Sequence, residues 1–240
     1  MRVEIWSDVV CPWCYIGAAR FDQALTAFDH RDQVQVVHRS FELDPTRDHA
    51  HVEPVQKMLA EKFGPQGPGM EQRVAQLAQA EGLGYRTDRQ VGSTLDAHRL
   101  LQFAKDKSLQ HELLNALYEA NFADAASIFT TDALVEIAAK TGLDGDEARS
   151  VLDDPNAYLD AVRADEHEAK QLGANGVPFF VLDRRYGVSG AQSVEAFGQA
   201  LRAAWADQAP ADADADAAAC GPDDSCEVPG AVAAGSEATD

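Results

Sequence analysis

The sequence predicts an α/β fold in which a large all-helical segment separates an N-terminal βαβ unit from a C-terminal ββα unit. Within the first 43 residues, two strand-like patterns flank one amphipathic helical pattern. From residue 54 to 172 the pattern is helical, and strand patterns return only from residue 176. Since the sheet-forming segments lie at both ends, a helical insertion into one sheet fold explains this order better than two consecutive domains.

The N-terminal unit begins with residues 2–7, "RVEIWS", whose alternating apolar and polar side chains are typical of a short strand. A helix is expected from Cys11 or Pro12 to about Asp29, because apolar residues recur there at helical spacing. Residues 33–43, "QVQVVHRSFEL", are β-branched and aromatic and predict a second strand. A strand–helix–strand connection joins parallel strands.

The middle of the chain contains amphipathic helical stretches with almost no strand signal. Gly-Pro breakers interrupt it at residues 63–70, and a helix start is expected at Thr131 or Asp132. A short helix and a long helix are expected between residues 146 and 173. We therefore expect an all-helical insertion domain over residues 51–173.

The C-terminal unit begins with residues 176–192, "GVPFFVLDRRYGVSGAQ", where "DRRY" suits a hairpin turn. A last helix follows, capped by Ser193. Residues 1–50 and 174–206 should therefore form one domain. The acidic tail, residues 207–240, has no basic residue and no periodicity, which predicts disorder.

Composition limits the possible partners and the cellular compartment. The 240 residues carry 40 Asp and Glu against 20 Lys and Arg, a net charge of −20, which argues against binding to nucleic acid or anionic membranes. No export signal and no run of about 18 apolar residues is visible, so a cytoplasmic protein is expected. Because permanent disulfides are rare in a reducing cytosol, the four cysteines suggest chemistry or metal binding.

Cys11 and Cys14 form a Cys-x-x-Cys motif between the first strand and the first helix. A zinc site would need two more ligands, but Cys220 and Cys226 lie in the tail and no His pairs obviously with the motif. We therefore expect no metal. A second alternative is a pair of buried cysteines that only pack.

A redox role fits the position of the motif better. Unpaired N–H groups and the dipole at a helix N-terminus stabilise a Cys11 thiolate, the nucleophile of disulfide exchange. Cys14 lies one turn further along, where it can resolve a mixed disulfide. Pro12 occupies the first turn, where a missing N–H costs nothing, and Trp13 offers apolar cover beside the thiol.

Val177 and Pro178 stand directly before a predicted strand, the place where a sheet tolerates proline. By itself this pair indicates only a loop boundary. Together with strand–CxxC–helix upstream and hairpin–helix downstream, it strengthens the redox interpretation, and a cis peptide there would be a purposeful feature.

With "SDVVCPWCYIG", "SFELDP" (40–45), "DAHRLLQFA" (96–104) and "GVPFFVLDRRYGVSGAQ", the sequence resembles the DsbA-like branch of the thioredoxin superfamily, specifically its FrnE-type group. The resemblance covers roughly residues 1–205. It implies a thioredoxin fold with a helical insertion and exchange with protein thiols or disulfides. It also implies that Cys11 attacks, that Cys14 resolves, and that a cis-Pro178 faces them. On this pattern the backbone of Val177 binds a substrate strand.

Two features depart from the secreted DsbA oxidants: this sequence shows no export signal, and it carries Pro-Trp where they carry His between the cysteines. Their strongly oxidising potential therefore cannot be transferred to this chain. The sequence is also similar to 2-hydroxychromene-2-carboxylate isomerases and kappa-type glutathione transferases. The latter have Ser at the position of Cys11, so the complete CxxC favours redox work. A redox-linked chaperone is the non-enzymatic alternative.

The remaining expectations concern the tail, one histidine and the small-molecule partners. Cys220 and Cys226 are either incidental or an auxiliary redox pair, as some FrnE-type proteins carry near the C-terminus. His98 is a packed residue or, by the resemblance, a substrate-binding residue that lines the active-site cleft. No bound cofactor is needed, and glutathione is considered only as a redox partner.

Overall fold

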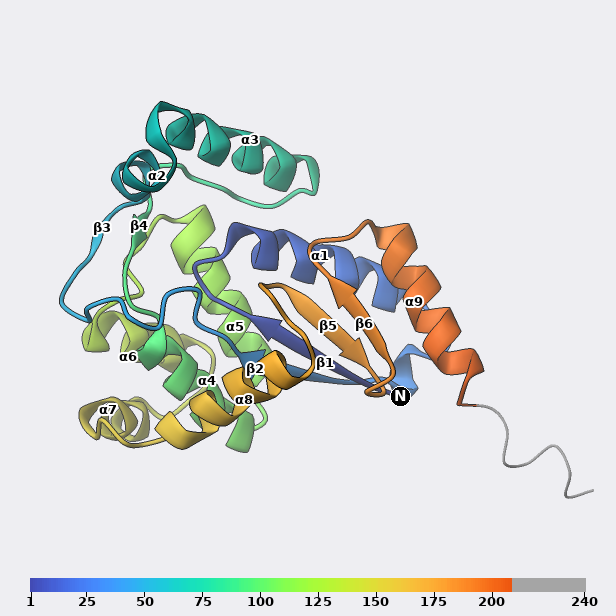
Figure 1. Cartoon of the computed structure of the whole chain (residues 1–240). Coiled ribbons are helices and arrows are strands. Elements are labelled where there is room, and N and C mark those ends of the chain that lie inside the picture. The colour runs from blue at the N-terminus through green and yellow to red at the C-terminus, as the bar shows by residue number, and fades with distance from the viewer. Residues whose placement is uncertain (209–240) are drawn as a thin grey trace, which may run out of the picture. The chain divides into compact units, whose positions relative to one another are not determined.

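The two ends of the chain meet in one four-stranded sheet (Figure 1). The structure is a computed structural model that describes residues 1–208. The strands follow the order β2-β1-β5-β6, with β1 parallel to β2 and antiparallel to β5. Their bounds are β1 (Arg2–Ser7), β2 (Gln35–Ser40), β5 (Phe179–Leu182) and β6 (Tyr186–Ser189). The predicted βαβ unit, with its parallel strand pair, is confirmed.

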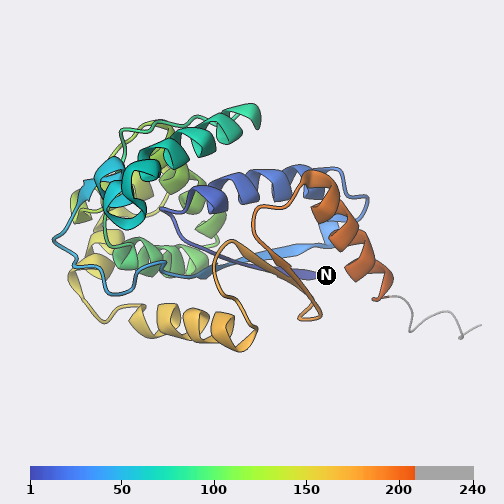
Figure 2. The ribbon, with the colours of Figure 1, turned by 45° about the horizontal axis from the view of Figure 1, so that its top comes forward.

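Helices cover both faces of this sheet, and alternation along the strands decides which side chains meet them (Figures 1 and 2). On one face α1 (Pro12–Thr26) and α9 (Val194–Ala206) pack on Ile5 and Phe180. On the other face Trp6 belongs to a second apolar cluster with α8 (Leu159–Gln171). Each sheet face therefore has its own core.

The middle of the chain is helical, as predicted, with one difference. Residues 53–54 (β3) and 90–91 (β4) pair as a two-stranded antiparallel sheet. Two-residue strands are too short to produce a periodic pattern, so sequence analysis missed them. The helical elements are α2 (Val55–Phe63), α3 (Gly67–Ala80), α4 (Leu95–Asp106), α5 (Gln110–Tyr118), α6 (Thr131–Lys140) and α7 (Gly145–Asp153), with 3-10 turns at Arg31–Gln33 and Gly64–Gln66 and a π-helical turn at Glu119–Ala123.

Local signals mark the turns and caps correctly. Asp183 and Arg184, in "DRRY", adopt positive φ angles of 48° and 56° and form the tight turn between β5 and β6. The hydroxyl of Ser193 accepts a hydrogen bond from the Ala196 N–H at the start of α9. Thr130 caps α6 in the same way, so α6 begins at Thr131 as expected.

A layer of paired charges lies between the sheet and α8. Arg39 of β2 donates hydrogen bonds to the buried carboxylates of Glu4 on β1 and Asp165 on α8, with Nε–Oε1 and Nη1–Oδ1 distances of 3.0 and 2.7 Å.

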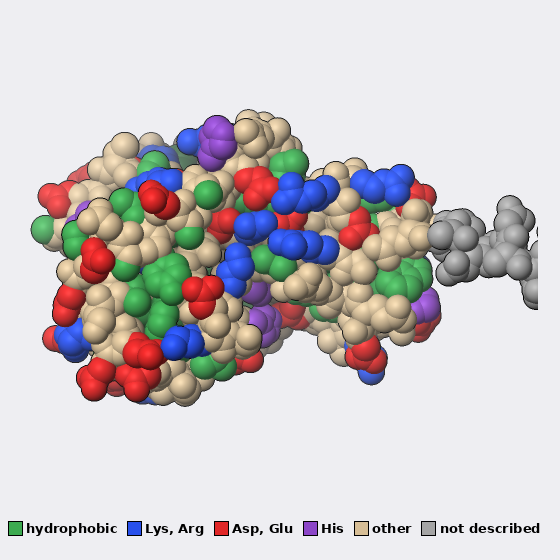
Figure 3. Space-filling view, turned by 90° about the horizontal axis from the view of Figure 1, so that it is seen from below, with side chains coloured by type: hydrophobic (Ala, Val, Ile, Leu, Met, Phe, Trp, Pro, Cys, Tyr) green, Lys and Arg blue, Asp and Glu red, His purple; other side chains and the backbone are tan. Residues whose placement is uncertain are grey.

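On the face seen from below, Lys and Arg side chains gather near the middle beside acidic ones, despite the net negative charge (Figure 3).

Residues 1–208 form one compact unit. Among these residues no helix is long and apolar enough to cross a bilayer. The expectations about the tail, including Cys220 and Cys226, fall on residues 209–240, outside the described part of the chain.

Candidate functional site

Cys11 and Cys14 lie where β1 passes into α1, at the end of the sheet closest to the helical insertion (Figure 1). Cys11 is the N-cap of α1, with extended backbone angles and no side-chain capping bond, and Pro12 occupies the first helical position. The two thiols are unpaired and buried, with 4% of Cys11 and 1% of Cys14 exposed. Sequence analysis therefore placed the motif correctly.

The surroundings of the two thiols separate their acidities. The Cys14 thiol donates a hydrogen bond that lowers the pKa of Cys11; burial opposes this effect, and the N–H groups of Cys14 and Trp13 reinforce it. Burial raises the pKa of Cys14 well above its ordinary value, and the hydrogen bond to Cys11 raises it further. Cys11 is thus the more readily ionised of the two, as a nucleophile must be.

The loop before β5 faces Cys11. The Val177–Pro178 peptide is cis, and the Cys11 Sγ lies 3.7 Å from the Val177 carbonyl oxygen. Gly17 of α1 permits this close approach, because a Cβ there would lie 2.9 Å from Pro178 Cγ. The structure therefore brings Cys11, Val177 and Pro178 together from segments about 160 residues apart.

A carboxylate that sequence analysis did not single out lies beside the dithiol. Asp8 is buried in the loop between β1 and α1. Its Oδ2 accepts a hydrogen bond from the Leu43 N–H at 2.7 Å, and its main-chain oxygen accepts one from the Cys11 N–H at 3.1 Å. The charge of Asp8 raises the pKa of both cysteines. The sequence feature that could have pointed to Asp8 is its position: it is a polar residue at the end of an apolar strand, three positions before Cys11.

A π-helical turn supports the same loop from the insertion. Asn121 is fully buried in this turn, and its Nδ2 donates a hydrogen bond to the Val9 carbonyl oxygen at 3.3 Å. The turn continues α5, whose Tyr118 packs at a tilt against the rings of Tyr15 and Phe122. π-turns are frequent at functional sites, and this one shapes the wall beside the dithiol.

His98 differs from the expectation that it lines the cleft. It is 1% exposed in α4, and its Nε2 lies 3.4 Å from Asp8 Oδ1, behind the dithiol. The motifs "SFELDP" and "DAHRLLQFA" meet there, since Gln102 Nε2 donates to Ser40 Oγ at 2.9 Å. The hydrogen bond between Gln102 and Ser40 cannot be predicted from sequence spacing, because it joins two segments about 60 residues apart.

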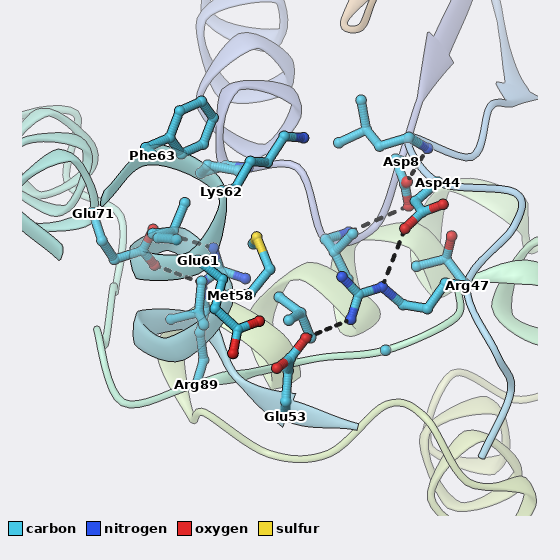
Figure 4. Close-up of a pocket in the computed structure, with 18 residues that line it drawn as sticks. Asp8, Asp44, Arg47, Glu53, Met58, Glu61, Lys62, Phe63, Glu71 and Arg89 are labelled. Carbon is cyan, nitrogen blue, oxygen red and sulfur yellow. Dashed lines mark hydrogen bonds and ion pairs between the residues drawn. The ribbon is translucent and has the colours of Figure 1, made fainter. Parts of the chain in front are cut away.

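A cavity of about 600 Å³ is lined in part by Asp8, Val10 and Pro12, the residues on either side of Cys11 in the chain (Figure 4). Pro12 lines it together with the exposed apolar residues Leu43 and Phe63, while Trp13 is 42% exposed beside Pro12. Three basic and five acidic side chains also line it: Arg47, Lys62 and Arg89, and Asp8, Asp44, Glu53, Glu61 and Glu71.

Two of these cations have charge or donors that no carboxylate of the described residues fully satisfies. Arg89 is 2% exposed and paired with Glu71 through Nε at 2.8 Å, but its Nη1 has no hydrogen-bond partner among the described residues. Lys62 has no carboxylate within ion-pair distance among residues 1–208; its Nζ lies 5.6 Å from the Phe63 ring centroid. Sequence analysis gave no signal for either residue, because their roles depend on how α2, α3 and β4 pack.

A sheet of this order, with a CxxC motif at the start of its first helix and a proline before β5, defines the thioredoxin class of fold. The chain belongs to the family of the DSBA-like thioredoxin domain, which it matches over residues 2–202. This is a family of thiol oxidoreductases, and the predicted fold and family are thereby confirmed.

Individual proteins agree with this assignment. The chain is similar to the structure of a probable DsbA oxidoreductase from Streptomyces coelicolor, with 58% identity, a TM-score of 0.85, and coverage of 96% of this chain and 100% of that one. It is 29% identical to the uncharacterized protein YwbO of Bacillus subtilis, over 84% of this chain and 96% of that protein. The cytosolic disulfide reductase DsbM of Pseudomonas aeruginosa, solved with GSH, shares the fold at 18% identity and a TM-score of 0.62, over 86% of this chain and 100% of that one.

Proposed function

We propose that the protein exchanges disulfides with protein substrates through Cys11 and Cys14. The carrying observation is the asymmetry of the dithiol: the pKa of Cys11 is lowered, the pKa of Cys14 is raised, and only Cys11 faces the Val177 carbonyl. The subgroup motifs, which join behind the dithiol through Ser40 and Gln102, support an FrnE-type enzyme.

The proposed reaction has two balanced steps. The Cys11 thiolate attacks one sulfur of a substrate disulfide, so a Cys11–substrate disulfide forms and the other substrate sulfur leaves as a thiolate that takes up a proton. Cys14 then loses its proton and attacks the Cys11 sulfur. This step releases the second substrate thiol and leaves a Cys11–Cys14 disulfide. The reverse sequence oxidises a substrate dithiol.

The roles of the neighbouring residues follow from the same reaction. The backbone at Val177 would hold a substrate strand beside Cys11, and the exposed Trp13 and the cavity-lining Pro12 would contact the residues that flank the substrate sulfur. Pro178 would shape this loop. An apolar surface at the mouth suits partly unfolded polypeptides better than compact, polar ones.

A trapping experiment tests the proposal. With Cys14→Ser, the first step is expected to proceed and the second to stop, so insulin should accumulate as a covalent adduct on Cys11. The adduct is measured by non-reducing electrophoresis and mass spectrometry, with Cys11→Ser/Cys14→Ser as the control. If Cys14→Ser forms no more adduct than this control, Cys11 is not the attacking thiol.

A second candidate function is exchange with glutathione, and the cavity favours it. Glutathione carries two carboxylates and one amino group, and the cavity lining offers Lys62 for a carboxylate and acidic side chains for the amino group. The cavity adjoins Pro12, so a tripeptide held there can place its sulfur at Cys11. Glutathione would then be a substrate that resets the dithiol.

Lys62→Ala separates this candidate from exchange with proteins. We expect the KM for glutathione disulfide to rise about two- to fivefold, the scale of one solvent-accessible ion pair, with kcat nearly unchanged. Lys140→Ala is the control, because Lys140 is an exposed lysine on α6 that pairs with Glu136, and neither residue lines the cavity. Equal KM values for the two variants would count against glutathione binding in this cavity.

A further inference from the structure

A buried pair of charged or chargeable groups lies directly behind the dithiol. The Asp8 carboxylate is fixed by the Val10 and Leu43 N–H groups, at Oδ1 and Oδ2 respectively, and is 1% exposed. These two hydrogen bonds hold the carboxylate in place, and very little of its surface reaches solvent. A fixed negative charge there disfavours a second negative charge on Cys11.

His98 is the cationisable group closest to this carboxylate. Its Nε2 lies 3.4 Å from Asp8 Oδ1, but the ring N–H is not aligned with that oxygen, and neither ring nitrogen has a hydrogen-bond partner among residues 1–208. Leaving both nitrogens of a buried imidazole unpaired is costly. A proton on His98 would turn the contact between its Nε2 and Asp8 into an ion pair, while Nδ1 keeps no partner among the described residues.

Other charged groups around the pair are already matched. Glu42, in the loop after β2, is near His98, but it is paired with Arg163 of α8, which also binds Glu166. Tyr118 of α5 and the two cysteines are the remaining titratable groups close to Asp8. His98 is therefore the group on hand to offset the charge of Asp8.

We propose that His98 is a positioning residue for the redox reaction: a proton on its imidazole offsets the Asp8 charge and so stabilises the Cys11 thiolate. This inference rests on the proposed function and deepens it. Reduction of the Cys11–Cys14 disulfide takes two electrons from a substrate dithiol, which becomes a disulfide. Of the two protons released, one goes to Cys14 and the other stays in solution to the extent that Cys11 remains a thiolate. Stabilising this thiolate makes the enzyme a stronger oxidant.

A double-mutant cycle tests the proposal in the full chain. All variants carry Cys220→Ser and Cys226→Ser, so that Cys11 and Cys14 are the cysteines that react. The readouts are the pH profile of Cys11 alkylation by iodoacetamide and the equilibrium constant with glutathione. At pH values below the midpoint of the wild-type profile, His98→Gln should lower the rate of Cys11 alkylation by about tenfold. It should also shift the equilibrium constant with glutathione by about tenfold, toward a weaker oxidant. A tenfold change in the equilibrium constant corresponds to about 30 mV.

The other variants of the cycle test whether His98 acts through Asp8. Asp8→Asn should shift both readouts in the opposite direction, and Asp8→Asn/His98→Gln should match Asp8→Asn alone. His167→Gln is the matched control, since His167 is exposed on α8 and should change nothing. An unchanged profile in His98→Gln, or an equal shift with and without Asp8, would overturn the proposal.

The design also separates failure of this inference from failure of the proposed function. Alkylation of Cys11 measures its thiolate directly and needs no disulfide exchange. If His98→Gln does not fold, as judged by circular dichroism, Asp8→Asn still decides: no gain in Cys11 reactivity would overturn the inference. A chain that exchanges with no disulfide at all would instead remove the proposed function.

Discussion

Cys11→Ser is expected to abolish disulfide exchange, lowering the rate by at least about three orders of magnitude, the scale seen when a covalent nucleophile is removed. A serine hydroxyl does not ionise near neutral pH and cannot form a mixed disulfide. The measurement is the rate of insulin reduction by the purified chain with glutathione as the electron source. The fold should be unaffected, because the side chain makes no capping bond and, among residues 1–208, donates a hydrogen bond only to the Val177 carbonyl oxygen.

Cys14→Ser provides the matched comparison. It should retain a single rapid reaction of Cys11 with the substrate but turn over far more slowly, since Cys14 no longer resolves the mixed disulfide and only external glutathione can. The position of Cys14 inside the first turn, fully buried, means that it is protected from the substrate until the first step has occurred. If instead Cys11→Ser keeps activity and Cys14→Ser loses it, the two roles are reversed.

Arg39→Leu is expected to produce the largest loss of stability, about 3–5 kcal/mol at pH 7. The substitution leaves the buried carboxylates of Glu4 and Asp165, 1% and 4% exposed, without their shared cation. Urea unfolding followed by circular dichroism measures the change. Arg31→Leu is the control; Arg31 is 57% exposed and should change stability by no more than about 0.5 kcal/mol.

The same variant should alter the pH dependence of stability. Burial acts to raise the pKa of Glu4, but Arg39, with Arg2 and Arg184, outweighs it, so the folded protein holds the pKa of Glu4 below its ordinary value. The corresponding stabilisation is complete above the unfolded pKa of about 4.3 and is lost as the pH falls through the folded pKa. Without Arg39, only Arg2 and Arg184 oppose the effect of burial, so the pKa of Glu4 rises and protonation at low pH costs the variant less stability than it costs the wild type. The difference between wild type and Arg39→Leu should therefore shrink from pH 7 to pH 4, and a constant difference would contradict this account.

Much of the fold follows from local sequence patterns. Alternation along residues 2–7 predicts β1, and the turn residues Asp183 and Arg184 mark the hairpin because short polar and flexible side chains accept left-handed angles there more readily than β-branched ones. Ser193 begins α9 because its hydroxyl satisfies an otherwise unpaired N–H group. In each case the physical cause acts between residues a few positions apart.

The missed features depend on contacts between distant segments. The strands β3 and β4 pair Glu53 with Val91, and Arg89 finds Glu71 only because α3 folds back beside it. For His98 the sequence left a packed residue and a cleft-lining residue as alternatives, and α4 places it in the interior near Asp8, 90 residues earlier in the chain. No periodicity within one segment reports such a meeting.

The reactive atoms of the site can be recognised from the sequence. Cys11 and Cys14 lie one helical turn apart at the start of a helix, with Pro12 directly after Cys11, and this pattern has the chemistry of a dithiol. The tertiary structure decided what surrounds them. It places Val177 and Pro178 next to Cys11 and buries Cys14. It also brings His98 within 3.4 Å of Asp8 and forms the cavity that Asp8 and Pro12 line. The reason is that a thiol's acidity and access depend on the charges and packing within a few ångströms, and long-range folding alone brings those groups there.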